Sequence, residues 1–184
     1  GSETQTLPAY VALDDPIHST IVGGSRNWHS GWLPPIYQGT RLRSVGSPLL
    51  NLEAEQEYPS PVLQLARDLQ HRMADDHRHK RPQQAQLAAR IASYELAARM
   101  QISATDALDI STETKTIHEM YGLNDPVTSP YGRRCLMARR LVERGVRFVQ
   151  IFVNTHENPN PWDHHGDIEK GLRAQCGQTD LPVA

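Results

Sequence analysis

The clearest alternation of apolar and polar positions lies in residues 131–166. From Arg133 to Arg144 the apolar residues repeat at helical spacing and the charged ones take the other side, which predicts an amphipathic helix. Gly145 follows, where a helix commonly ends in a left-handed residue. Residues 146–153 are almost continuously apolar, β-branched or aromatic, which predicts a strand covered on both faces. A helix leading directly into such a strand indicates an α/β fold.

Two shorter extended segments are predicted near the start of the chain. Residues 7–13 form an apolar run that ends in Asp14 and Asp15, as a buried strand stopped by turn residues would. These two aspartates suit either metal binding or, as we expect, hydrogen bonds to local backbone amides. Arg41 and Arg43 alternate with apolar neighbours, so they are either solvated strand charges or contacts for an anionic substrate group.

The middle of the chain, about residues 53–130, is predicted to be mostly helical. Ser60 followed by Pro61 is a typical helix start, and helices are also expected over residues 83–101 and 110–121. We interpret this region as a helical cap or insertion beside the sheet. Near the end of the chain, residues 168–175 predict a short helix, and Thr179 to Pro182 predict the start of another.

Candidate ligands for a metal ion follow the predicted strand of residues 146–153. His156 comes first, and Trp162, Asp163, His164 and His165 follow within a few residues. Ligands of open α/β sheets gather past the carboxyl ends of strands. Carboxylate oxygen and neutral imidazole nitrogen suit zinc, manganese or iron. From the spacing alone, a polar surface loop that happens to contain histidines remains the alternative.

Composition narrows the possible partners. A chain of 184 residues allows one domain with a sizeable core, and a net charge of −2 gives no indication of a nucleic-acid or membrane-surface partner. No apolar run approaches the roughly 18 residues of a membrane-spanning helix. Cys135 and Cys176 allow one disulfide bond, although Cys135 on an apolar helix side is more typical of a buried free thiol.

Several longer motifs point to one family. The chain carries, in order, the runs LPAYVAL, YQGTRLRS, RIASYELAARMQ, YGRRCLMARRLVERGVRFVQ, WDHHG and TDLPVA. Together they resemble the DUF1501 family, which is sulfatase-like and belongs to the alkaline-phosphatase-like superfamily. The resemblance spans essentially residues 1–184. It implies part of an alkaline-phosphatase-like sheet with the helical insertion at residues 53–130, in an internal fragment of a longer protein.

The resemblance also implies roles for particular residues. Asp163 and His165 match the metal ligands of a Trp-Asp-x-His-Gly motif, and the metal would be divalent, namely zinc, manganese or calcium. His164 occupies the variable position and would support the site or face the substrate. Trp162 would form a pocket wall, and His156 is a weaker candidate. The nucleophile and the remaining ligands are expected outside these 184 residues.

Two functions from different classes follow. In the first, the chain is part of a metal-dependent hydrolase of sulfate or phosphate esters, incomplete as it stands, acting on a small-molecule or glycan ester in the periplasm or outside the cell. In the second, it is part of a non-catalytic binding or structural protein that keeps the hydrolase fold, because fold alone does not confer chemistry.

Overall fold

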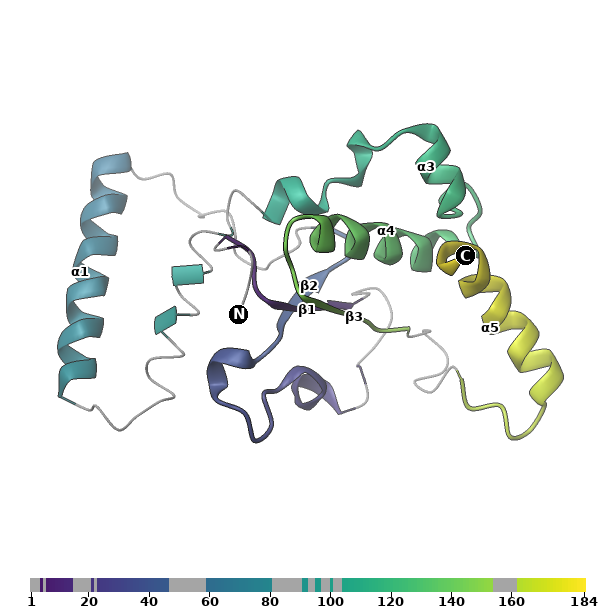
Figure 1. The fold of residues 1–184 in the computed structure, drawn as a ribbon, viewed down its shortest axis with the longest axis horizontal. Helices are drawn as coiled ribbons and strands as arrows, with labels where there is room; N and C mark the ends of the chain where they lie inside the picture. The colour runs from purple at the N-terminus through teal and green to yellow at the C-terminus, as the bar shows by residue number, and fades with distance from the viewer. Residues whose placement is uncertain are drawn as a thin grey trace.

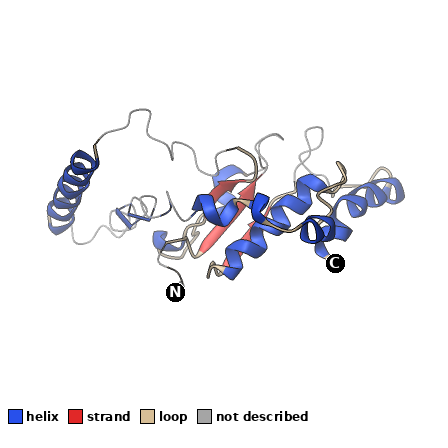
Figure 2. Ribbon diagram, turned by 90° about the horizontal axis from the view of Figure 1, so that it is seen from above, coloured by secondary structure: helices blue, strands red, loops and turns tan. Residues whose placement is uncertain are grey.

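A three-stranded parallel sheet lies at the centre of the molecule (Figures 1 and 2). The computed structural model describes residues 4, 6–14, 21, 23–46, 59–80, 91–92, 95–96, 100, 104–153 and 162–184. The strands are β1 (Tyr10–Asp14), β2 (Thr40–Arg43) and β3 (Phe148–Ile151), in the order β2-β1-β3. The α/β class expected from the sequence is therefore confirmed.

Every described element between β2 and β3 is helical. The α-helices are α1 (Ser60–His79), α3 (Lys115–Met120), α4 (Ser129–Glu143) and α5 (Ile168–Val183). Short 3-10 turns are η1 (Gly24–Trp28), η2 (Pro35–Tyr37) and η3 (Ile110–Thr112). The predicted start of α1 at Ser60 is confirmed. α4 begins at Ser129, four residues before the predicted Arg133, because Pro130 is accommodated in the first helical turn.

The pleat of the sheet sends alternate residues of β1 to two different layers. Val11 and Leu13 are fully buried against α4, in one cluster with Leu42 of β2 and with Leu136 and Leu141 of α4. Burying each such side chain stabilises the fold by about 1.5–3 kcal/mol. Ala12 faces the other way and packs with Trp28 from η1. Both faces of the central strand are therefore covered.

Close approach between η1 and β1 depends on a glycine. A Cβ atom at Gly39 would lie 2.8 Å from the ring of Tyr10 and 3.0 Å from the Cβ of Trp28. The ring of Trp28 also meets that of Phe152 edge-on, with centroids 5.9 Å apart. Trp28 therefore fastens this loop to the sheet, whereas Trp32, four residues later, is 93% exposed.

β3 departs from the prediction of a strand covered on both faces. It spans Phe148–Ile151 rather than residues 146–153, and it lies at an edge of the described sheet. Phe148 is 57% exposed, and the other three residues are half-buried. Apolar composition alone cannot distinguish a central strand from an edge strand that a helix covers on one side, as α4 does here.

α5 departs from its prediction more clearly. A helix over residues 168–175 and a new helix starting at Thr179 were expected, but one helix runs from Ile168 to Val183. The hydroxyl of Thr179 donates to the carbonyl of Gln175 at 3.1 Å instead of capping a new helix, and Pro182 falls in the last turn. Packing on α4 buries Gln175, Thr179 and Pro182 on one side of α5, and this packing outweighs the local start signal.

A buried arginine joins α4 to the segment before it. Arg140 donates to the carbonyl oxygens of Asp106 and Ala107 and to the carboxylate of Glu113, over distances of 2.5–3.0 Å. The side chains of Arg140 and Glu113 are only 7% and 14% exposed. Cys135 and Cys176 are both free thiols, so the possible disulfide bond is absent.

In both ribbon views α1 lies at the left of the picture and α5 at the right, with the sheet between them (Figures 1 and 2). Its apolar residues are largely exposed, with Leu65 at 69% and Met73 at 65%. Among the described residues, no helix is both long enough and apolar enough to cross a membrane.

Candidate functional site

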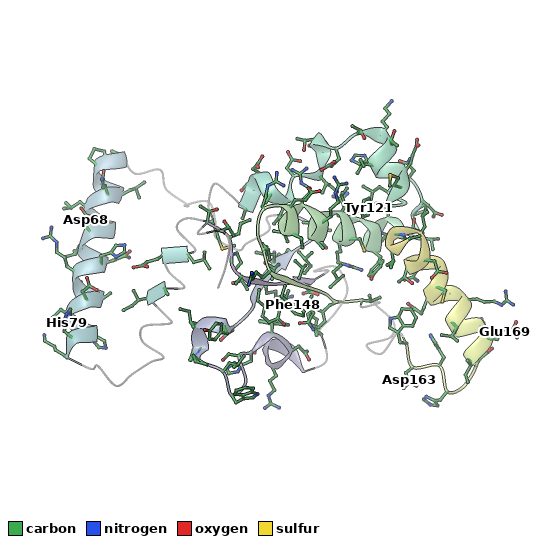
Figure 3. All side chains as sticks on the ribbon, viewed as in Figure 1. Asp68, His79, Tyr121, Phe148, Asp163 and Glu169 are labelled. Atoms are coloured by element: carbon green, nitrogen blue, oxygen red, sulfur yellow. The ribbon has the colours of Figure 1, made fainter. Side chains whose placement is uncertain are left out.

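The predicted metal-binding residues lie on a turn between β3 and α5. Figure 3 labels Asp163 on this turn and Glu169 in the first helical turn after it. Asp167 caps α5, because its carboxylate accepts the backbone N–H of Lys170 at 3.1 Å. The backbone N–H of Asp167 in turn donates to the carbonyl of His164 at 3.2 Å. The turn is therefore tied to the start of a helix.

Asp163 and His165 point toward each other. Asp163 Oδ1 lies 2.5 Å from His165 Nδ1, so an imidazole N–H donates to the carboxylate. Both side chains are solvent-accessible, at 51% and 87%. This hydrogen bond lowers the pKa of Asp163 and raises the pKa of His165, because it stabilises the charged form of each group. Such a pair is a carboxylate and an imidazole held together on the surface.

His164 is held differently from its two neighbours. Its ring packs on Gly171 of α5, where an added Cβ would lie 2.2 Å from His164 Nδ1. His164 Nε2 is buried and has no hydrogen-bond partner. The structure thus uses this ring to seat the turn on α5, and the absence of a side chain at Gly171 makes room for it.

The two remaining predicted site residues, Trp162 and His156, are not seen to contact the pair within the described part of the chain. Trp162 is 49% exposed at the start of the turn. His156 lies outside the described residues. The structure thus brings together Asp163 and His165, with His164 as an anchor beneath them.

The donor atoms of the pair suit a divalent cation. Two protein ligands of a tetrahedral ion lie about 3.4 Å apart when each metal–ligand distance is near 2.1 Å. Asp163 Oδ1 and His165 Nδ1 are closer than that, and small side-chain rotations would open the gap. Among the described residues, no three or more His, Cys, Asp or Glu side chains form a group that could hold an ion. The turn therefore offers two ligands of a site that needs at least one more.

Asp14, another possible metal ligand named above, has an environment that the sequence did not indicate. The expectation that it bonds local turn amides was wrong, because it is the last residue of β1 and is fully buried. Its Oδ2 accepts two hydrogen bonds from Arg41, including one of 2.8 Å from Nε. Its Oδ1 is buried without a partner. The pairing could not be seen locally, because Arg41 lies on a neighbouring strand 27 residues later.

Comparison with protein-family models gives a match over the whole chain. The model of DUF1501, described as "Protein of unknown function (DUF1501)", covers residues 1–184. The chain belongs to the DUF1501 family. For this DUF1501 chain, no curated protein and no solved structure gives a match. The family assignment therefore supports the resemblance seen in the sequence motifs, and it carries no stated activity.

Proposed function

We propose that the DUF1501 chain is part of a metal-dependent hydrolase of sulfate or phosphate esters, built on an alkaline-phosphatase-like sheet. The observation that carries this proposal is the convergence of Asp163 and His165 on a turn that follows a parallel strand. Ligand sites of open α/β sheets collect past the carboxyl ends of strands. The substrate class and an exported location follow from the resemblance to sulfatase-like proteins.

In the proposed site, Asp163 and His165 would hold the cation. When bound, a divalent ion stabilises negative charge on a transferring phosphoryl or sulfuryl group. Asp163 is suited to this task because an aspartate is ionised at neutral pH, and the hydrogen bond from His165 lowers its pKa further. His165 binds a cation only when it is neutral, and its raised pKa makes protons stronger competitors. His164 keeps both ligands in place through its contact with Gly171.

A non-catalytic binding or structural role is the second candidate. The two converging ligands that the described residues supply are compatible with this role as well as with the hydrolase. A family member that had lost turnover would still keep the sheet and the turn. The two candidates make different predictions about the intact protein.

Metal binding is the first test. We expect titration calorimetry at pH 8 to show Zn²⁺ or Mn²⁺ binding to this chain, weakened at least ten-fold by Asp163→Asn, since a lost ligand typically removes much of a site's affinity. His79→Gln is the matched control, because His79 is an exposed histidine whose hydrogen bond among the described residues is to the carbonyl of Asp75 in its own helix. Equal affinities in all three proteins would contradict the assignment of Asp163.

Turnover is the second test. The intact protein should hydrolyse aryl sulfate or aryl phosphate esters, and Asp163→Ala should abolish the reaction. Activity that is unchanged by Asp163→Ala would remove the proposed site. A protein that binds the metal but hydrolyses neither ester with any divalent ion would favour the non-catalytic role.

A further inference from the structure

Two arginines of β2 share the face of the sheet that η1 covers. Arg41 pairs with Ala12 and Arg43 pairs with Asp14 in the parallel register of β1 and β2. Side chains two residues apart on a strand project from the same face about 6.6 Å apart. Arg41, Arg43 and Asp14 therefore lie on one face, at the carboxyl end of the two strands. The leucine between the arginines, Leu42, points into the core on the other side.

Arg41 is held in one orientation by two contacts. Its Nε and Nη2 both donate to Asp14 Oδ2. Its guanidinium carbon lies 5.8 Å from the ring centroid of Trp28, within range of a cation–π interaction. Nη1 makes no hydrogen bond within the described part of the chain, and the side chain is 47% exposed. One edge of this guanidinium is occupied by Asp14, and its remaining N–H groups are available.

Arg43 is half-buried, and no hydrogen bond or ion pair joins it to a described residue. A buried or half-buried guanidinium normally has an anionic or carbonyl partner, because its N–H donors lose water on burial. Asp14 carries a single negative charge, so among these three described side chains the two guanidinium groups leave a net positive charge. The two guanidinium groups thus have N–H donors without an acceptor among the described residues, together with an excess of positive charge. An external anion would accept from these donors and balance the charge.

We propose that Arg41 and Arg43 form a binding site for a tetrahedral oxyanion, the sulfate or phosphate group of an ester or the free anion. A spacing of about 6.6 Å lets two guanidinium groups contact different oxygens of one such group. Asp14 lies buried beneath Arg41, so it positions the arginine while the anion meets the exposed edge. The ester as natural ligand rests on the proposed function, but anion binding itself needs neither turnover nor a metal ion.

Thermal unfolding with EDTA present tests the site directly. We expect sodium sulfate or phosphate at ten-fold its dissociation constant to raise the Tm by roughly 3 to 6 °C above sodium chloride of equal ionic strength. Arg43→Gln should lose most of this rise, and Arg41→Lys should reduce it, since lysine keeps the charge but not the fork. Arg173→Gln is the control, because Arg173 is an exposed arginine paired with Glu169 on α5, and it should keep the full rise.

Each outcome decides the proposal. The proposal is overturned if sulfate and chloride act alike, or if Arg43→Gln responds as the unchanged chain does. A larger rise with an aryl sulfate than with inorganic sulfate identifies the ester as the ligand, and equal rises identify the free oxyanion. Asp163→Asn should keep the rise in EDTA. If the rise is present but the intact protein hydrolyses no ester, the anion site stands and the proposed hydrolase fails.

Discussion

At the scale of single residues, the hydrogen bond between Asp163 and His165 couples two protonation equilibria. The pKa of His165 is raised above its ordinary 6.5, so its contribution to stability is complete below pH 6.5 and is lost as the pH rises through the raised value. The pKa of Asp163 is lowered from 3.8, so its contribution is complete above pH 3.8 and is lost as the pH falls through the lowered value. The pair is therefore fully formed between pH 3.8 and 6.5.

This coupling gives a prediction for His165. In Asp163→Asn the imidazole loses its anionic acceptor, and we expect the pKa of His165 to fall back toward 6.5. NMR titration of the histidine ring protons measures both values. His79, far from the turn on α1, should titrate identically in the two proteins. A His165 pKa that is the same with and without the carboxylate would show that the two side chains do not interact in solution.

At the scale of elements, two glycines of α5 give a matched pair. At Gly171 a Cβ would lie 2.2 Å from His164, whereas at Gly177 it would meet nothing within 4 Å. We expect Gly177→Ala to stabilise the protein by about 0.5–1 kcal/mol through helix propensity. Gly171→Ala should fail to gain this stability, and it should shift the NMR signals of His164 and His165 as the turn moves. Urea denaturation and NMR provide the two readouts, and equal behaviour of the two variants would contradict the packing of His164 on α5.

Local signals predicted those elements whose determinants are adjacent in sequence. Ser60 and Pro61 mark the start of α1, and the helix and strand around Gly145 appear in the expected order. Where the prediction failed, the determinant lies elsewhere in the chain. The length of α5 depends on packing against α4.

The candidate site likewise has features that local sequence predicts and features that depend on distant residues. Asp163 and His165, two positions apart, were expected to bind a metal ion together; a hydrogen bond joins their side chains, and metal binding itself stays a prediction. The contact between His164 and Gly171 spans a turn and a helix start, and no periodicity reveals it. The role of Asp14 depends on the register between β1 and β2, which a single sequence does not specify.

At the scale of the whole molecule, the ion pair of Arg140 and Glu113 joins α4 to the segment around η3. We expect Arg140→Ala to destabilise the fold by about 3–5 kcal/mol, because it leaves the carboxylate of Glu113 and two backbone carbonyls without their donor. Urea denaturation measures the change in the free energy of unfolding. Arg173→Ala, which removes an exposed pair with Glu169, should change it by at most about 0.5 kcal/mol. Similar losses in both variants would argue against a structural role for the buried pair.

The strand order has a consequence for biosynthesis. β1 is the first of the described strands yet lies between β2 and β3, and its Tyr10 contacts Gln150, 140 residues further on. At about 5–20 residues per second, a ribosome needs roughly 7–28 seconds to make that interval. During this time the nascent β1 has one flank without its neighbour, and its apolar side chains lack the cover of α4. Of the described strands, the central one is therefore the one that waits longest to be enclosed.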